Sequence, residues 1–427
     1  MPKQTRTSSG RYVSRLTSGT LAVVMAGGRG QRLHDLTAHR CKPATPFGGK
    51  FRIIDFVLSN CINSGIRQIY LMTQYKGQSL IQHVQRGWGY LRGEFGEFID
   101  VVPAQQQIGE HWYRGTADCV YQNIELIRAQ RSKHVLVLAG DHIYKMDYGP
   151  MIAYHVEKGA DITVGVVEVP RLRAVEFGVL SVTESNLVTG FKEKPREPDG
   201  VPGRSDVALA SMGIYVFNSR LLEKVLLEDA NDANSVHDFG RNIIPQAIDR
   251  MKVFAYPFTD VRTKAQNYWR DVGTVDAFYD ANIELVHVAP ELNLYDDQWP
   301  IWTYQTHQPP AKFVLDELGR RGSAVNSMVS GGCIVSGAFV DQSLLFSDVR
   351  VDERSHIFRS VVMPGVRVGA GCEIRHAIID EGSEIPDGMQ IGLNRKLDGE
   401  RFHVTDNGVV LVTSDMLGRL AGGAAGA

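Results

Sequence analysis

The sequence predicts an α/β domain with a mostly parallel sheet, followed by a parallel β-helix of hexapeptide repeats. Two patterns in the 427 residues support this prediction. Strand-like and helix-like segments alternate over residues 20–287, which is typical of parallel sheets with helices on both faces. From residue 326 onward, aliphatic side chains recur every six residues. An antiparallel strand has a period of two, so the six-residue period favours a stack of short parallel strands.

Short apolar runs define the strands of the first domain. They occupy residues 20–25, 68–72, 134–139 and 161–169. In sheets of this kind, ligands bind beyond the carboxyl ends of the strands. The first run is followed by Gly27 and Gly28, and the third by Gly140 and Asp141. We therefore expect the functional site at this edge of the sheet.

The repeat can be written as four rows of three side chains, with 17 residues between equivalent positions of successive rows. The rows are Met328, Ile334, Val340; Leu345, Val351, Ile357; Val362, Val368, Ile374; and Ile379, Ile385, Ile391. We expect three strands to make one triangular coil, with these side chains stacked in columns inside it.

Composition predicts the remaining boundaries. Residues 1–19 are rich in Ser, Thr and Arg and lack acidic side chains, so we expect a disordered lead-in there. Residues 421–427 contain only Gly and Ala and predict a disordered tail. Residues 288–325 hold clusters of proline and tryptophan, typical of a linker that packs on another element. This division leaves 20–287 for the α/β domain and 326–420 for the β-helix.

Charge and cysteine content narrow the class of protein. The chain has 46 basic and 48 acidic side chains, a near balance that gives no reason to expect nucleic-acid or membrane partners. No apolar run in the sequence reaches the roughly 20 residues that span a bilayer. The five cysteines lack CxxC spacing, which argues against a disulfide framework or a zinc knuckle. We therefore expect a cytoplasmic protein.

A glycine-rich loop, AGGRGQRL (residues 26–33), directly follows the first strand. Its glycines allow backbone N–H groups to approach a polyphosphate, and Arg32 can neutralise the negative charge. Alone this is weak evidence, because most glycine turns after a strand are only turns. Lys42 adds a second cation near the same loop, which favours a triphosphate site.

Further motifs follow in order along the chain. They are KPA (42–44), FGGKFRIIDF (47–56), WYRGTADCVYQN (112–123), LAGDHIYKMDY (138–148), EFGVL (176–180), FKEKP (191–195), ASMGIYVF (210–217) and YWRDVGT (268–274). In this combination the chain resembles the sugar-nucleotide pyrophosphorylase family over nearly its whole length. It is most similar to the bacterial ADP-glucose pyrophosphorylases, or glucose-1-phosphate adenylyltransferases. The resemblance implies a Rossmann-like nucleotidyltransferase domain and a left-handed β-helix.

The resemblance also implies a reaction. The adenylyl group of ATP would pass to α-D-glucose 1-phosphate, giving ADP-glucose and pyrophosphate for glycogen or other α-glucan synthesis. The implied catalytic residues are Arg32, Lys42, Asp141 and Lys194. ATP would contact Gly27, Gly28, Arg32, Lys42, Gly115 and Asp141. Glucose 1-phosphate would contact Tyr113, Gly178, Glu193, Lys194 and Ser211.

Two of these expectations have a physical basis in local sequence. Gly115 opens a predicted helix, whose free N–H groups we expect to face an anion. Asp141 and Asp271 are expected to bind Mg²⁺, since carboxylate oxygens are the ligands that this ion prefers. An isolated aspartate is more often a helix N-cap or a turn residue; within these two motifs the metal role is favoured.

Regulation is a further implication of the resemblance, together with a homotetramer and AMP-type inhibition. Family members that respond to fructose 1,6-bisphosphate are basic at three positions that correspond here to His39, Ser414 and Gly418. Fewer cations favour an activator of lower charge, such as fructose 6-phosphate or pyruvate. The expected regulatory residues are His39, Arg40, Arg52 and Arg419, near the cleft between the two domains.

Two alternatives remain open. The chain could be a sugar-1-phosphate nucleotidyltransferase with a different base or sugar. It could also be a non-catalytic regulatory subunit, although the intact Arg32, Lys42, Asp141 and Lys194 argue against this. Some β-helix acyltransferases use a catalytic histidine, but His356 and His376 lack partners in the sequence, so we expect a structural role for both.

Overall fold

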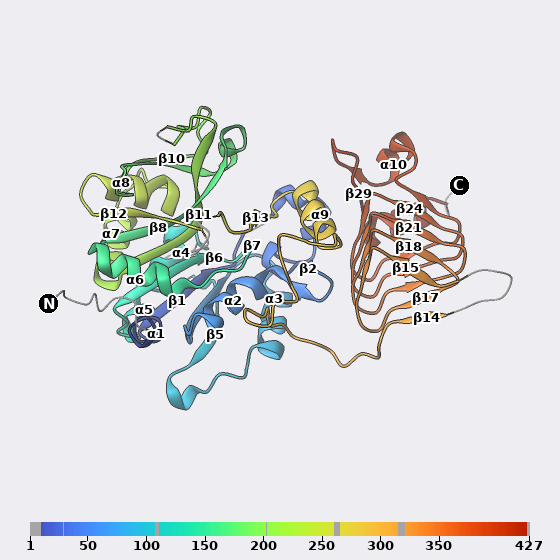
Figure 1. Cartoon of the computed structure of the whole chain (residues 1–427), viewed down its shortest axis with the longest axis horizontal. Coiled ribbons are helices and arrows are strands. Elements are labelled where there is room, and N and C mark those ends of the chain that lie inside the picture. Colours follow the sequence, from blue (N-terminus) through green and yellow to red (C-terminus); the bar gives the residue numbers. More distant parts are fainter. Residues whose placement is uncertain are drawn as a thin grey trace.

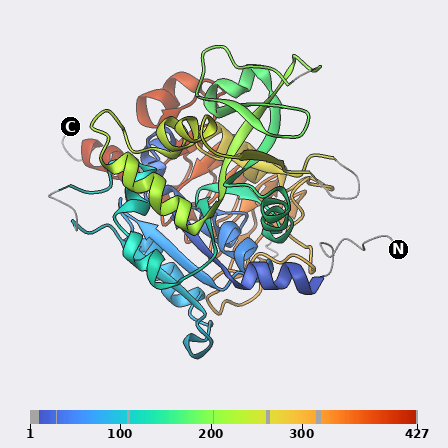
Figure 2. The same ribbon diagram turned by 90° about the vertical axis from the view of Figure 1, so that its left-hand side faces the viewer.

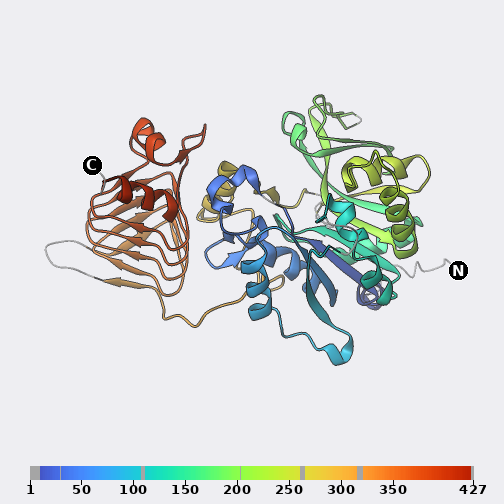
Figure 3. The ribbon, with the colours of Figure 1, turned by 180° about the vertical axis from the view of Figure 1, so that it is seen from behind.

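The computed structural model describes residues 10–28, 30–106, 111–201, 203–259, 265–314 and 321–424. Figure 1 shows an α/β domain beside a domain of stacked short strands. Figure 3 shows the linker that crosses from the first domain to the second. Within the described residues, no helix is long and apolar enough to cross a membrane.

The α/β domain is built on one nine-stranded sheet with the order β10-β9-β11-β6-β1-β4-β5, to which β8 and β12 are added beside β11. Strands β1, β4, β5 and β6 run parallel, whereas β11 is antiparallel to its neighbours. The strand bounds are β1 (Thr20–Met25), β4 (Gln68–Thr73), β5 (Phe98–Pro103), β6 (His134–Ala139), β8 (Ile162–Pro170), β9 (Gly178–Val182), β10 (Val188–Glu193), β11 (Val207–Asn218) and β12 (Val253–Pro257). The predicted α/β fold class, parallel at its centre, is confirmed.

Helices cover both faces of this sheet, as Figure 2 shows from the side of the α/β domain. Within β1, Leu21 and Val23 belong to one apolar cluster, while Ala22 and Val24 belong to another. Burial on both faces explains why the strand is apolar without alternation. The helices are α1 (Gly10–Ser18), α2 (Ile53–Asn63), α3 (Gln78–Gly87), α4 (Thr116–Tyr121), α5 (Ile124–Ala129), α6 (Tyr148–Lys158), α7 (Ser219–Ala230), α8 (Ile244–Ile248) and α9 (Val275–Glu284).

Shorter elements connect the main strands and helices. Strands β7 (His142–Tyr144) and β13 (Trp269–Asp271) form a separate antiparallel pair, as do β2 (Pro46–Phe47) and β3 (Phe51–Arg52). The 3₁₀ segments are η2 (Gln31–Thr37), η3 (Lys42–Ala44), η4 (Gly93–Phe95) and η5 (Arg171–Glu176), and η6 (Phe239–Ile243) is a π-helical turn.

The two ends of the chain differ from their predictions. Residues 10–18 form α1, which packs on α6 (Figure 2), so the predicted lead-in is wrong for this segment. Its side chains gain order from this tertiary contact, which composition does not reveal. At the other end, residues 421–424 continue α11 (Ser414–Ala424). The remainder of both predictions, residues 1–9 and 425–427, lies outside the described residues.

The linker packs along α2, as expected. The indole N–H of Trp299 donates to Asn60 Oδ1 at 2.9 Å, and Thr303 Oγ1 donates to Asp55 Oδ2 at 2.6 Å. The linker is shorter than predicted, however. Strand β14 (Lys312–Val314) already pairs with the β-helix, and so does β15 (Ser323–Val325), so the predicted boundary at residue 326 is too late.

The β-helix has three parallel sheets, one for each side of its coils. The first contains β14, β17 (Ile334–Ser336), β20 (Arg350–Val351), β23 (Arg367–Val368) and β26 (Glu384–Ile385). The second contains β15, β18 (Phe339–Asp341), β21 (His356–Phe358), β24 (Glu373–Arg375) and β27 (Gln390–Ile391). The third contains β16 (Met328–Val329), β19 (Leu344–Leu345), β22 (Val361–Val362), β25 (Ala377–Ile379), β29 (Val410–Val412) and β28 (His403–Val404), with α10 (Arg395–Arg401) before β28.

The predicted columns are confirmed from Val340 onward. Val340, Ile357, Ile374 and Ile391 pair in succession and are fully buried. The first row is wrong at two positions. Val329 pairs with Leu345 and Val335 with Val351, so the inward residues are one place later than Met328 and Ile334.

The Ile374 column gives a direct test of this register. Ile374→Asp would place an unpaired carboxylate among buried aliphatic side chains, and we expect a loss of about 3–5 kcal/mol in stability. The same substitution at Arg367, whose side chain is exposed one strand earlier, should change stability by less than about 0.5 kcal/mol. Urea unfolding of both variants checks the difference. Equal midpoints would contradict the assigned register.

The two domains share an apolar core. Phe278 and Tyr279 of α9 belong to the same buried cluster as Leu344, Val361 and Ile378 of the third β-helix sheet. Polar contacts flank this cluster. The buried Arg40 donates from Nη2 to both carboxylate oxygens of Asp380, at 2.9 and 3.0 Å. The position of one domain is therefore fixed against the other by packing and by a buried ion pair.

Candidate active site

Three charged side chains meet where the sequence predicted a site. Asp141 follows β6 after one glycine, and Asp271 ends β13, which pairs with β7 beside it. Lys42 lies in η3 and is buried. Its Nζ is 3.0 Å from Asp141 Oδ2 and 2.7 Å from Asp271 Oδ1. The fold thus brings together residues that lie far apart in sequence.

The electrostatics of this cluster follow from its geometry. Burial would raise the pKa of each carboxyl group, but the adjacent Lys42 ammonium outweighs it and holds the pKa of Asp141 and of Asp271 below the usual range. Burial alone would lower the pKa of Lys42, yet the two carboxylates raise it. All three side chains are therefore ionised at neutral pH, with a net charge of minus one.

Arg32 extends the cluster toward solvent. Its Nη2 is 3.5 Å from Asp271 Oδ2, and its Nη1 is 3.6 Å from Glu176 Oε2. About half of the Arg32 side chain is exposed (53%), so its guanidinium can also reach a ligand. A Cβ at Gly273 would lie 2.7 Å from Arg32 Nη2, so the Arg32 guanidinium packs directly against the turn after Asp271.

The same residues fit a divalent cation. Ligand atoms of Asp141, His142 and Asp271 all lie within 4.8 Å of one another. Two hard carboxylate oxygens suit Mg²⁺. The third member of the group, His142, was missed in the sequence; the one available signal was its position next to Asp141. Its Nδ1 is buried and makes no hydrogen bond within the described part of the chain.

A second group of predicted residues surrounds Glu193. A Cβ on Gly178 would lie 2.8 Å from Glu193 Oε2, and one on Gly240 would lie 2.7 Å from the same atom. Burial, followed by the nearby Asp238, raises the pKa of Glu193. Lys194 has a positive φ of 47° and a largely exposed Nζ, 3.9 Å from Glu193 Oε1. Asp238 and Gly240 were missed, because no motif marked their segment.

Aromatic stacking joins the two groups. The Trp269 ring packs edge-on against His142 on one side and Phe177 on the other, with centroids 5.0 and 5.4 Å apart. Phe177 precedes Gly178 directly. On the same side, a Cβ at Gly213 would lie 3.8 Å from the His142 ring, and the N–H of Gly213 donates to Ser211 Oγ at 3.3 Å. The cation cluster and the Glu193 group are therefore parts of one site.

Tyr113 and Gly115 come from the segment before α4. The hydroxyl of Tyr113 accepts a hydrogen bond from Asn123 Nδ2 at 2.9 Å, and burial raises its pKa to about 12. The expectation of free N–H groups after Gly115 is wrong. The amides of Ala117 and Asp118 both donate to the carbonyl of His237, at 2.8 and 3.4 Å. The same carbonyl would lie 2.2 Å from a Cβ at Gly115, so this glycine permits a close approach of two backbone segments.

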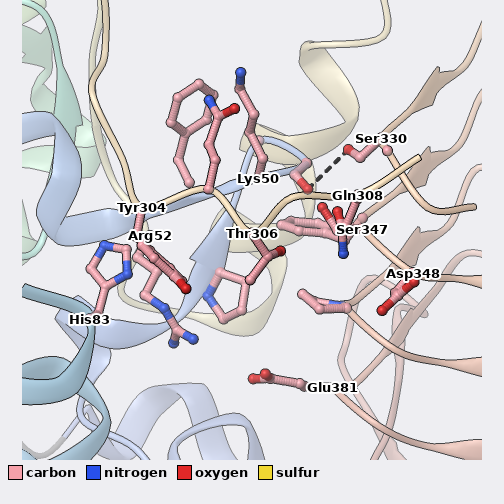
Figure 4. Close-up of a pocket in the computed structure, with 18 of the residues that line it drawn as sticks. Lys50, Arg52, His83, Tyr304, Thr306, Gln308, Ser330, Ser347, Asp348 and Glu381 are labelled. Atoms are coloured by element: carbon pink, nitrogen blue, oxygen red, sulfur yellow. Dashed lines mark hydrogen bonds between the residues drawn. The ribbon is translucent and has the colours of Figure 1, made fainter. Parts of the chain in front are cut away.

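A cavity of about 1370 Å³ lies between the two domains. Three of the four predicted regulatory residues line it: His39, Arg40 and Arg52. Arg419 is exposed on α11 and is absent from the lining. Figure 4 shows Arg52 with Lys50 and His83 on the side of the α/β domain, facing Ser347, Asp348 and Glu381 of the β-helix.

The cations of this cavity are not equally available. Arg40 is bound to Asp380, and its Nη1 lies 3.7 Å from Glu381. The ring of His39 is 2.7 Å from Asp415 Oδ2. Lys50 was not predicted to be regulatory, and its side chain is exposed. The sequence feature that could have identified it is its place in the FGGKFR motif.

Two family models match the two domains. The nucleotidyl transferase model matches residues 21–287, and the model of the GlmU-like, C-terminal hexapeptide matches residues 309–412. A glucose-1-phosphate adenylyltransferase of Nitrosococcus oceani is 57% identical over 416 residues, covering 97% of this chain and 98% of the relative. Those of Methylobacillus flagellatus and Methylococcus capsulatus are 58% and 57% identical, covering 98% of this chain and 98% and 99% of each relative. The chain belongs to the glucose-1-phosphate adenylyltransferase family.

Membership of this adenylyltransferase family confirms the resemblance drawn from the motifs. It also confirms that the chain is a nucleotidyltransferase in class, and that a hexapeptide domain follows the catalytic one. The cluster of Lys42, Asp141 and Asp271 lies within the part matched by the nucleotidyl transferase model.

Proposed function

We propose that the chain transfers the adenylyl group of ATP to α-D-glucose 1-phosphate, producing ADP-glucose and pyrophosphate for α-glucan synthesis. The observation that carries this proposal is the convergence of Arg32, Lys42, Asp141 and Asp271 beyond the carboxyl ends of β1 and β6. Such a site suits a polyphosphate substrate that binds together with a metal ion. The cationic side chains can face the phosphates, and the carboxylates can hold the metal ion.

The chemistry needs no covalent enzyme intermediate. A phosphate oxygen of glucose 1-phosphate attacks the α-phosphorus of ATP, the bond to the β-phosphate oxygen breaks, and pyrophosphate leaves. The substrate phosphate is already a nucleophile, so catalysis consists of alignment and charge neutralisation. Arg32 and Lys42 would stabilise the leaving pyrophosphate, and Lys194 would align the attacking phosphate. Gly27, Gly28 and Gly115 would line the ATP side.

Asp141 and Asp271 would hold Mg²⁺. When bound, this ion neutralises charge on the reacting phosphates. Lys42 bridges the same two carboxylates, so its ammonium would lie beside the cation and supply a further positive charge for the phosphates.

The remaining predicted residues would bind the sugar. The half-buried Glu193 carboxylate can accept hydrogen bonds from glucose hydroxyls, beside Gly178, where a Cβ would crowd it. Tyr113 and Ser211 would complete this side of the pocket. Pyrophosphate release from ATP and glucose 1-phosphate tests the whole assignment. A panel of other nucleoside triphosphates and sugar phosphates distinguishes it from a relative of different specificity, and no release with any pair would indicate a non-catalytic subunit.

Lys194 gives a prediction specific to the sugar phosphate. Its side chain is 54% exposed and has only a distant partner in Glu193, so its ammonium can bind an anion. Loss of a charged hydrogen bond in Lys194→Gln should raise KM for glucose 1-phosphate about ten- to a hundredfold, with KM for ATP unchanged. Lys192→Gln, at the end of β10 where the lysine pairs with Asp199, is the matched control. A KM increase confined to ATP would refute the role.

We also propose that the cavity between the domains binds regulatory anions. With Arg40 engaged by Asp380, the other cations that line the cavity are Lys50, Arg86 and Arg52, with His39 on one side, while Asp348 and Glu381 face them. The Nη1 of Arg52 donates to the carbonyl of Ala44. This balance favours an activator of low charge, such as fructose 6-phosphate or pyruvate, and AMP as the inhibitor. Arg419 would act only if α11 moves, since it does not line the cavity.

Activation curves at fixed substrate test this proposal. Fructose 6-phosphate or pyruvate should stimulate activity at lower concentration than fructose 1,6-bisphosphate, and Arg52→Gln should weaken the response without changing basal turnover. Strong stimulation by fructose 1,6-bisphosphate alone would contradict it. The proposed assembly is a homotetramer in the cytoplasm, which light scattering of the purified chain can test.

A further inference from the structure

One part of the C-terminal domain reaches the catalytic loops. It is the hairpin formed by β28 and β29, which extends from the last coil of the β-helix. Figures 1 and 3 both show this hairpin next to α9 of the catalytic domain. Two of its side chains, His403 and Thr405, contact segments that flank active-site residues.

The first contact is a ring stack between the domains. The rings of His403 and His34 lie with centroids 3.8 Å apart and planes inclined by 28°. His34 follows Arg32 by two residues and interrupts η2, with φ of 51° and ψ of −136°. Residues other than glycine rarely adopt this conformation, and it persists only where the surroundings hold it. The stack on His403 is such a support for the loop that carries Arg32.

The second contact reaches the loop that carries Asp271. The buried Thr405 donates from Oγ1 to Asp276 Oδ1 at 2.6 Å. Asp276 lies in the first turn of α9, which begins directly after the Asp271–Thr274 turn. Arg32 and Asp271 themselves lie 3.5 Å apart. The hairpin therefore contacts a neighbour in sequence of each member of this ion pair, His34 for Arg32 and Asp276 for Asp271.

We propose that this hairpin positions the two catalytic loops, with His34 as a positioning residue for adenylyl transfer. His34 and His403 do not touch reacting atoms; they act through the placement of Arg32, and Thr405 acts through that of Asp271. The inference rests on the roles proposed above for Arg32 and Asp271. It gives the hexapeptide domain a direct part in the geometry of the ATP side of the site, distinct from the effector cavity.

Four variants of the full chain test the inference, by kinetics with each substrate varied in turn. His403→Ala removes the stack, and we expect kcat/KM for ATP to fall at least about fivefold, because small displacements of a catalytic group are costly. KM for glucose 1-phosphate should not change. His403→Phe retains a stacking ring and should restore kcat/KM for ATP. Thr405→Val should act in the same direction as His403→Ala, whereas Thr405→Ser should not.

The matched control is His356→Ala. The ring of His356 also packs against a ring, that of Phe339 with centroids 5.2 Å apart, but both lie within the β-helix. Equal kinetics for His403→Ala and His356→Ala would overturn the inference, and so would an equal rise in KM for both substrates or a failure of His403→Phe to restore kcat/KM for ATP. Thermal unfolding of each variant excludes a general loss of folded protein. Arg32→Ala distinguishes a failure of this inference from a failure of the proposed function. If kcat/KM for ATP is unchanged in Arg32→Ala, the catalytic role proposed for Arg32 is itself wrong.

Discussion

Asp141→Asn is expected to lower turnover about a thousandfold with no loss of folded protein, because it removes the carboxylate charge that holds a catalytic cation. The substitution preserves shape, and Lys42 keeps its 2.7 Å contact with Asp271. The Asp141 side chain is about a third exposed (35%), so a neutral amide there remains hydrated. Steady-state turnover at saturating Mg²⁺, with calorimetric titration of Mg²⁺ or Mn²⁺, measures both consequences.

The control for Asp141→Asn is Asp199→Asn, a carboxylate paired with Lys192 on the surface. It should leave turnover and cation affinity as they are. Near-normal turnover of Asp141→Asn at saturating Mg²⁺, with unaltered cation binding, would remove Asp141 from the metal site.

Lys42→Met is expected to reduce both activity and stability. The buried ammonium is the group that keeps two facing carboxylates ionised, and its loss leaves them repelling one another. We expect stability to fall by about 2–3 kcal/mol at pH 7, less than for a fully buried pair because Asp141 is partly exposed. Turnover should also fall, since one of the cations that face the leaving pyrophosphate is absent.

The stability loss should depend on pH in a defined direction. In the native chain Lys42 depresses the pKa of both carboxyl groups, so their contribution is present above the unfolded value of about 3.9 and disappears as the pH falls through the folded pKa. In Lys42→Met this contribution is missing. The difference in urea midpoint between the two proteins should therefore persist from neutral pH down to about pH 4 and shrink below it. Lys224→Met, at an exposed pair with Glu228, should show no such trend.

Sequence patterns located most strands because burial on both faces leaves an unmistakable apolar run, as in β1. They failed where two neighbouring residues are both apolar. Met328 and Val329, or Ile334 and Val335, fit a six-residue period equally well, and the step to the next coil is shorter by one residue there. The α1 helix was missed for a different reason: its stability comes from contact with α6, and its composition alone favours disorder.

The site was predicted where a motif placed a charge at a strand end, as for Asp141 and Asp271. Their connection through Lys42 could not be predicted from the sequence, because it depends on how η3 packs against α2 and α3 in the folded chain. The carbonyl of His237 occupies the N–H groups after Gly115, although the two segments are far apart along the chain. Asp238 lies in no motif, and Glu176 opens the EFGVL motif without being predicted as a site residue. Both are recognised only through their neighbours, Glu193 and Arg32.

The continuous apolar cluster that runs from Phe278 and Tyr279 into the third sheet of the β-helix has a consequence for how the chain is built. Each half has apolar cores of its own, but this shared cluster is buried only where the two halves meet. A chain cut in the linker would therefore expose an apolar face on each fragment. Such fragments would aggregate or seek one another, and heating the intact chain would melt both halves in a single cooperative step. The hexapeptide domain therefore could not be exchanged freely between relatives, because it buries apolar surface of the catalytic domain.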